Sequence, residues 1–63
     1  MFEIKFTTEN AAFGTEYDSY SEIIKRKEIE RILYKIIAEV NMGFESNPIM
    51  DINGNKIGEW RMD

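Results

Sequence analysis

A long helical repeat of apolar residues constrains the fold of this 63-residue chain more than any other feature. At about 100° per residue, the apolar side chains span an arc of roughly 140° on a helix. These residues are Ile29, Ile32, Leu33, Ile36, Ile37 and Val40. Ser19 with Glu22 matches a capping box, and Gly43 matches a helix C-terminus. The sequence therefore predicts a helix over 20–42 with a wide core-facing stripe.

A strand is predicted ahead of this helix. Phe2, Ile4 and Phe6 alternate with charged residues, which is the period-two pattern of a strand with one face in water. Residues 7–18 have no such period, so we expect a connecting loop there.

A hairpin is predicted after the helix. Asn53-Gly54 lies between two predicted strand segments, 49–52 and 55–60. Asn-Gly favours a two-residue type I′ turn, because both central residues of that turn need a positive φ. The pairs expected from this register are Met50 with Ile57 and Asp51 with Lys56.

The element order predicts an α+β fold of the β-α-β-β type. One long helix packs on a three-stranded, antiparallel-type sheet in a single domain, 1–63. A domain of this size buries only about 60% of its unfolded surface, so its core is small. The chain has no cysteine and no histidine, which removes disulfides, thiolate metal sites and the usual general base. We therefore expect no catalytic residues, no metal and no cofactor, and we expect oligomerisation to support the core.

The charge balance argues against a general nucleic-acid binder. Eight basic and twelve acidic residues give a net charge of −4, whereas such binders neutralise phosphates with basic residues. The N-terminus lacks the apolar run of a signal peptide, and no stretch approaches the roughly 20 apolar residues of a membrane span. We expect a cytoplasmic protein without membrane contact.

The two halves of the predicted helix disagree about which side faces the core. A helix over 20–42 is about 35 Å long, whereas a compact domain of this size is roughly 27 Å across, so one end should overhang. Glu22, Lys25 and Arg26 share the side of the core stripe, where a buried charge is costly. Apolar residues on the far side are Tyr20, Ile23, Ile24, Tyr34 and Ala38.

Three interpretations remain open for this conflict. The helix kinks near 25–27, or the segment before residue 26 is not helical and tucks under the sheet, or the far side meets another subunit. Trp60 has two interpretations as well, because the predicted register turns it away from Ile57: it caps the core or it is an exposed interface anchor. The expected oligomer interface comprises Tyr20, Ile23, Ile24, Tyr34, Ala38 and Trp60.

A cationic stripe on the helix is the first candidate binding feature. Lys27, Arg31 and Lys35 are four residues apart. The glutamates that flank them are Glu28, Glu30 and Glu39. One interpretation is a solvated face with weak ion pairs. The other is an anion site, in which Arg31 binds a phosphate or carboxylate bidentately and an aromatic ring stacks on the rest of the ligand.

Two loops supply further polar candidates. Asp51, Asn53 and Asn55 resemble the start of a calcium loop, but Lys56 and Met62 stand where the required glycine and glutamate would be. The pattern therefore favours a turn stabilised by Asx side chains. In the stretch TENAAFG, residues 8–14, Asn10 and Phe13 either anchor the loop or line a shallow ligand pocket.

Three segments, in this order, resemble a family of very short phage and prophage proteins that is described as uncharacterised. The segments are TTENAAF near the start, EIERIL at 28–33 and DINGNKIGEW at 51–60, while 14–27 lies outside the resemblance. The resemblance implies a phage accessory protein that acts by binding, often against a host defence. The matching positions with functional potential are Asn10, Phe13, Glu28, Arg31, Asp51, Asn53 and Asn55. We expect them to meet at one end of the helix or across a subunit boundary.

Three functional hypotheses follow. The first is a non-enzymatic, oligomeric phage-type protein that sequesters a small anionic, nucleotide-like signal molecule in the host cytoplasm. The second is a protein-binding inhibitor of a host defence factor, and the third is a small phage regulatory or assembly factor.

Overall fold

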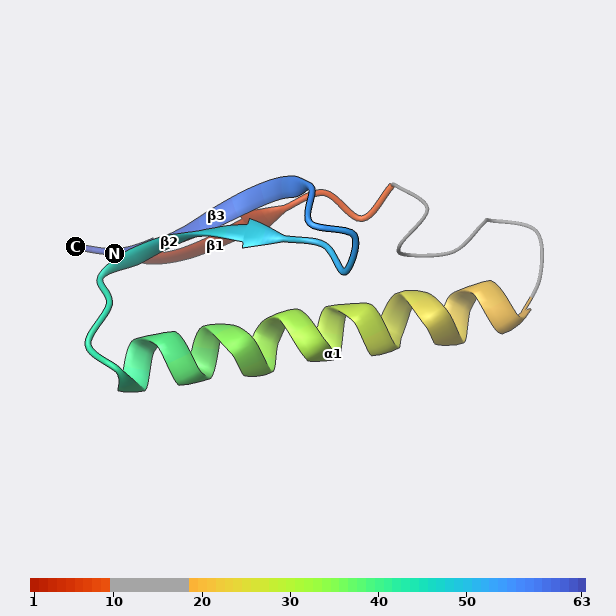
Figure 1. The fold of residues 1–63 in the computed structure, drawn as a ribbon, viewed down its shortest axis with the longest axis horizontal. Coiled ribbons are helices and arrows are strands. Elements are labelled where there is room, and N and C mark those ends of the chain that lie inside the picture. Colours follow the sequence, from red (N-terminus) through yellow and green to blue (C-terminus); the bar gives the residue numbers. More distant parts are fainter. Residues whose placement is uncertain (10–18) are drawn as a thin grey trace.

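One long helix lies along one face of a three-stranded sheet, which confirms the predicted α+β fold (Figure 1). The computed structural model describes residues 1–9 and 19–63. The predicted loop at 7–18 therefore lies largely outside the described residues. The elements, in chain order, are β1 (Phe2–Phe6), α1 (Ser19–Asn41), β2 (Ser46–Met50) and β3 (Lys56–Met62).

The C-terminal strand forms the middle of the sheet. The order is β1-β3-β2, and β3 pairs antiparallel with both neighbours. In the β1–β3 register, Ile4 pairs with Trp60 and Phe6 pairs with Gly58. The first and last parts of the chain are therefore joined through β3, and both termini lie at the same end of the molecule (Figure 1).

The turn between β2 and β3 differs from the type I′ prediction. Of the residues in this loop, only Gly54 has a positive φ, at +85°. The Asp51 N–H donates to the Asn55 carbonyl at 2.9 Å, and the Gly54 N–H donates to the Asp51 carbonyl at 3.0 Å. These bonds define a longer hairpin loop that ends in a left-handed glycine, as in a type I turn with a bulge.

The bulge shifts the predicted register at the end of the hairpin. Ile49 pairs with Gly58 and Met50 pairs with Lys56, so Ile57 is the extra residue, and the predicted Met50–Ile57 pair is wrong. The extra residue interrupts the alternation of sides along β3. As a result, Ile57 and Trp60 both enter the core, and Trp60 is only 1% exposed. The interpretation of Trp60 as an exposed interface anchor is therefore wrong.

The helix is rotated relative to the predicted core stripe. The buried core consists of Ile32, Ile36, Ile49, Ile57 and Trp60. Leu33 and Ile37, both predicted to face the core, are 41% and 55% exposed. Glu28 and Glu39 are buried in their place, at 6% and 7% exposure. Polar contacts to these two glutamates account for the rotation, as the next subsection describes.

The helix is continuous, which excludes a non-helical segment before residue 26. It extends past the strands at the end away from the termini (Figure 1). Of the predicted interface residues, Ile23, Tyr34 and Ala38 are exposed and Ile24 is half-buried. The side chain of Tyr20 lies outside the described part of the chain. In residues 1–9 and 19–63, no helix has the length and apolar character needed to cross a membrane.

Candidate functional site

The hairpin tip is attached to the middle of α1 by a glutamate–arginine pair. The Arg31 Nε donates to Glu28 Oε1 at 2.6 Å, and its Nη2 donates to Glu28 Oε2 at 3.2 Å. Nη2 also donates to the Met50 carbonyl at 3.1 Å. The Ile52 N–H donates to Glu28 Oε2 at 2.9 Å. Both side chains thus contact the backbone of the hairpin as well as each other.

The environment of Arg31 keeps its guanidinium charged. The hydrogen bond to Glu28 is the largest influence and raises the pKa of Arg31, although partial burial acts in the opposite direction. The negative charges of Glu28 and Asp51 also raise this pKa. Since the ordinary value is already far above neutral, Arg31 carries its positive charge throughout the physiological range.

Asp51 organises the hairpin loop from inside. Its buried carboxylate accepts the backbone N–H groups of Asn53 and Asn55 through Oδ1, each at 2.9 Å. The side-chain Nδ2 of Asn55 donates to Asp51 Oδ2 at 3.2 Å. This is the Asx-stabilised turn that the sequence favoured over a calcium loop. Among the described residues, no group of three or more acidic side chains is placed to hold a metal ion.

Five of the seven predicted ligand-binding residues meet at this junction. They are Glu28, Arg31, Asp51, Asn53 and Asn55. Asn10 and Phe13, the other two, lie outside the described residues. The junction is at the middle of the helix, so the expected meeting point at a helix end is wrong. The physical reason is that α1 is longer than the hairpin, whose tip reaches only about halfway along it (Figure 1).

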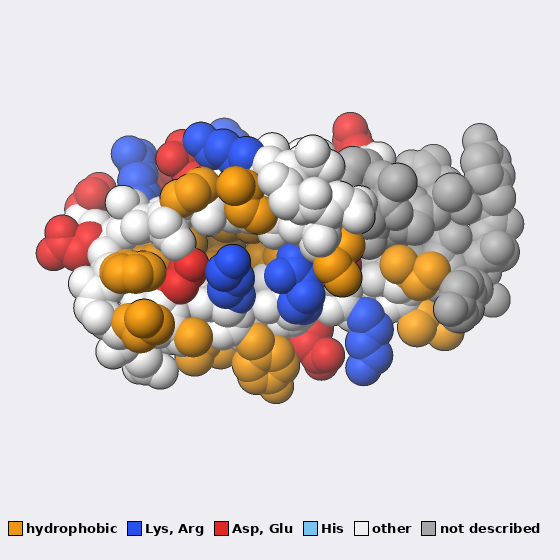
Figure 2. All heavy atoms as spheres, in the orientation of Figure 1, with side chains coloured by type: hydrophobic (Ala, Val, Ile, Leu, Met, Phe, Trp, Pro, Cys, Tyr) orange, Lys and Arg blue, Asp and Glu red, His pale blue; other side chains and the backbone are white. Residues whose placement is uncertain are grey.

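Basic side chains follow α1 on the side of the junction. Figure 2 shows Lys and Arg side chains gathered along the helix below the sheet. Lys27 Nζ lies 3.7 Å from Glu30 Oε1, and both side chains are largely exposed, so this ion pair is weak. Within the described residues, no hydrogen bond or ion pair holds the Lys35 ammonium group. We refer to Lys27, Arg31 and Lys35 as the basic row.

The burial of a second glutamate, Glu39, was not predicted from the sequence. Its Oε1 accepts the indole Nε1–H of Trp60 at 2.8 Å, and its Oε2 accepts the side-chain amide of Asn47. One signal for it was available. Glu28 and Glu39 are eleven residues apart, which places them on nearly the same line along a helix.

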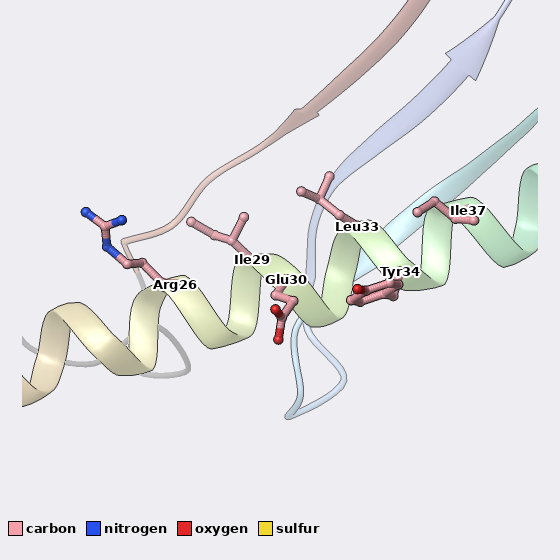
Figure 3. A pocket seen from close by; sticks show the side chains of 6 residues that line it. All are labelled: Arg26, Ile29, Glu30, Leu33, Tyr34 and Ile37. Atoms are coloured by element: carbon pink, nitrogen blue, oxygen red, sulfur yellow. The ribbon is translucent and has the colours of Figure 1, made fainter.

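The helix also has an exposed apolar side, which adjoins the basic row at Lys27 and Glu30. A shallow hollow of about 390 Å³ is lined by Arg26, Ile29, Glu30, Leu33, Tyr34 and Ile37. Figure 3 shows Ile29 and Leu33 pointing toward the sheet side, while Glu30 and Tyr34 point away from it. All six residues belong to α1, so one helix presents both a charged and an apolar surface.

No family model, no curated protein and no solved structure matches the chain. The contacts of the basic row, the hairpin tip and the exposed surfaces are therefore the features that bear on function.

Replacing Glu28 by alanine should lower the free energy of unfolding by about 1–3 kcal/mol. The Ile52 N–H loses its acceptor, and Arg31 loses its bidentate partner. The measurement is urea denaturation, with hydrogen exchange at the Ile52 amide as a local probe. Glu59→Ala is the matched control, because this exposed glutamate lies on β3 outside the junction, and it should change stability by less than about 0.5 kcal/mol. Equal stability of the two variants would show that the junction contributes nothing.

Proposed function

We propose that the protein is a non-enzymatic binding protein that takes up a small anionic, nucleotide-like molecule at the basic row. The supporting observation is the state of Arg31. Its hydrogen bonds to the described residues use Nε and Nη2, so toward that part of the chain the Nη1 edge is left for a ligand, and the side chain is 36% exposed. A guanidinium held in place loses little conformational freedom when it binds a phosphate.

The two lysines add positive charge that Glu28 does not offset. Glu28 compensates the charge of Arg31, so Arg31 contributes geometry more than charge. Lys27 and Lys35 lie one turn to either side and are exposed. The hairpin tip adds the exposed side-chain amide of Asn53, and Tyr34 lies three residues after Arg31 and is exposed. A phosphate on Arg31 with a base stacked on Tyr34 fits this arrangement.

The biological role that we propose is sequestration of a signal molecule in the host cytoplasm. The resemblance to short phage proteins supports this context. The chain contains no histidine and no cysteine, so binding without turnover is the simpler chemistry for it.

Isothermal titration with a panel of mono- and cyclic nucleotides tests this proposal. We expect heat with at least one of them, and we expect Lys27→Ala/Lys35→Ala to weaken that affinity by about tenfold or more. Lys5→Ala is the control, because Lys5 is exposed on β1 and does not belong to α1. No heat with any nucleotide, or an equal loss in the Lys5 variant, would overturn the proposal.

A second candidate, inhibition of a host protein, is favoured by the end of the molecule that holds both termini. Apolar side chains are exposed there next to acidic ones. The Met62 N–H donates to the Glu45 carbonyl at 2.9 Å, and the Asp63 N–H donates to the Met1 carbonyl at 3.3 Å, which brings these segments together. The exposed apolar residues are Met1, Phe2, Met42 and Phe44, and the acidic ones are Glu3, Glu45 and Asp63.

The apolar residues suit a protein partner, since aromatic residues and methionine are enriched in protein interfaces. The acidic residues around them suit a partner with a basic surface. Phe44→Glu should abolish capture of such a partner and leave nucleotide binding unchanged. If nucleotide binding fails and capture survives in the Phe44 variant, neither candidate is supported.

A further inference from the structure

The exposed apolar side of α1 is the kind of surface that another molecule covers in solution. The helix buries two glutamates, while Ile23, Leu33, Tyr34 and Ile37 are exposed. Exposed apolar residues that gather on one side of a helix beside a hollow are typical of an interaction surface. This side adjoins the basic row, since Lys27 Nζ lies 3.7 Å from Glu30 Oε1, but the pairing argued below uses neither Arg31 nor Lys35.

The residues along this side form a self-complementary pattern. Ile23, Arg26, Glu30 and Leu33 follow one another at spacings of three, four and three residues. The pattern is symmetric about residue 28: the two oppositely charged residues are in its middle, and the two apolar residues are at its ends. In an antiparallel pair of helices centred on residue 28, Arg26 lies opposite Glu30 and Ile23 lies opposite Leu33. A two-fold axis then makes each contact twice.

We propose that α1 of one copy pairs antiparallel with α1 of a second copy in this register. Charge complementarity selects the register, because centring the pair on residue 30 would place Glu30 against Glu30. The overlapping segments, 19–37, are about 28 Å long, or roughly five turns of each helix. Packing of two helices over this length is typical of antiparallel helix pairs. Ile37 extends the apolar contact beyond the symmetric pattern.

The contacts that Arg26 makes within one chain do not oppose this pairing. Its Nε lies 3.1 Å from Glu22 Oε1, but both side chains are more than half exposed, so the pair is weak and readily exchanged. The net charge of −4 per chain repels a second copy. At 0.15 M salt this repulsion is screened over about 8 Å.

Charge reversal with measurement of mass by sedimentation equilibrium tests the pairing. The unmodified chain should be a dimer at micromolar concentration and 0.15 M salt. Arg26→Glu and Glu30→Arg should each weaken self-association by about tenfold or more, because each places like charges together twice. Mixing the two variants should restore a dimer. The glutamate introduced in one chain then meets the arginine introduced in the other, and the remaining native Glu30 meets the remaining native Arg26. Both positions are exposed, so circular dichroism should show folded subunits throughout.

Disulfide cross-linking tests the orientation. The chain has no cysteine, so introduced thiols report only on the designed pairs. Ile23→Cys/Leu33→Cys should form an intermolecular disulfide under mild oxidation, whereas Ile23→Cys alone should not. Cross-linking of the single variant would show a parallel pair and overturn the register. A monomer mass for the unmodified chain, or no dimer in the mixture of charge variants, would overturn the proposal itself.

Discussion

Glu39→Ala is expected to destabilise the protein by about 2–4 kcal/mol, because a buried donor and a part-buried donor lose their acceptor. The indole Nε1 of Trp60 lies 2.8 Å from Glu39 Oε1. Trp60 is almost fully buried, so water cannot replace the lost carboxylate as the acceptor of its N–H. The amide of Asn47 loses the other carboxylate oxygen. A domain of this length typically has a total stability of about 3–9 kcal/mol, so this single change removes a large part of it.

Glu39→Gln is the matched control. It keeps the length of the side chain and one acceptor for the Trp60 N–H, and rotation of the Asn47 amide can satisfy the new NH₂ group. We expect a loss of about 1 kcal/mol, which reflects the charge of the original hydrogen bonds. Urea denaturation, followed by the fluorescence of the buried Trp60, measures both variants. Equal losses for alanine and glutamine would contradict a role for these hydrogen bonds.

Gly58→Ala is expected to separate β1 from β3 and to cost about 3 kcal/mol or more. A Cβ atom at this position would lie 2.0 Å from the Lys5 carbonyl oxygen and 2.5 Å from the Phe6 Cα. Both are backbone atoms of the neighbouring strand, so no side-chain movement relieves the clash. Phe6 pairs with Gly58 at the end of the β1–β3 ladder, and the strand must move away there.

Gly54→Ala controls for the general effect of replacing glycine. Gly54 has a φ of +85° and open space around its Cβ position, so alanine there brings backbone strain without a clash. The cost should be about 1–2 kcal/mol. Hydrogen exchange at the amides of β1 separates the two cases, because only Gly58→Ala should expose them. Retained protection of β1 in the Gly58 variant would contradict the prediction.

The sequence was sufficient for the elements that depend on local patterns. Alternation identified β1, helical spacing identified α1, and Asn53-Gly54 located the turn of the hairpin. The turn type was wrong because the Asp51 carboxylate binds the loop backbone, which a two-residue motif does not reveal. That difference shifted the register, and the predicted register favoured an exposed Trp60 although the sequence also allowed it to cap the core, where it lies.

The orientation of the helix was the larger error, and its cause is tertiary. Apolar spacing alone favours burial of Leu33 and Ile37 over burial of a glutamate. The contacts that reverse this preference come from β2, β3 and the hairpin loop, through Asn47, Trp60 and Ile52. The candidate site was more accessible to sequence reasoning, because Glu28 and Arg31 are one helical turn apart. Their hydrogen bonds to the hairpin backbone could be identified only from the folded structure.

Glu28 and Glu39 together fix the rotation of the helix about its own axis. Each is bonded to a different part of the sheet layer, and the two bonds lie three turns apart along α1. A rotation that brought Leu33 and Ile37 inward would break both at once. Cooperative resistance to this rotation keeps Leu33 and Ile37 turned outward in every copy of the chain, and no side chain among residues 1–9 and 19–63 buries them.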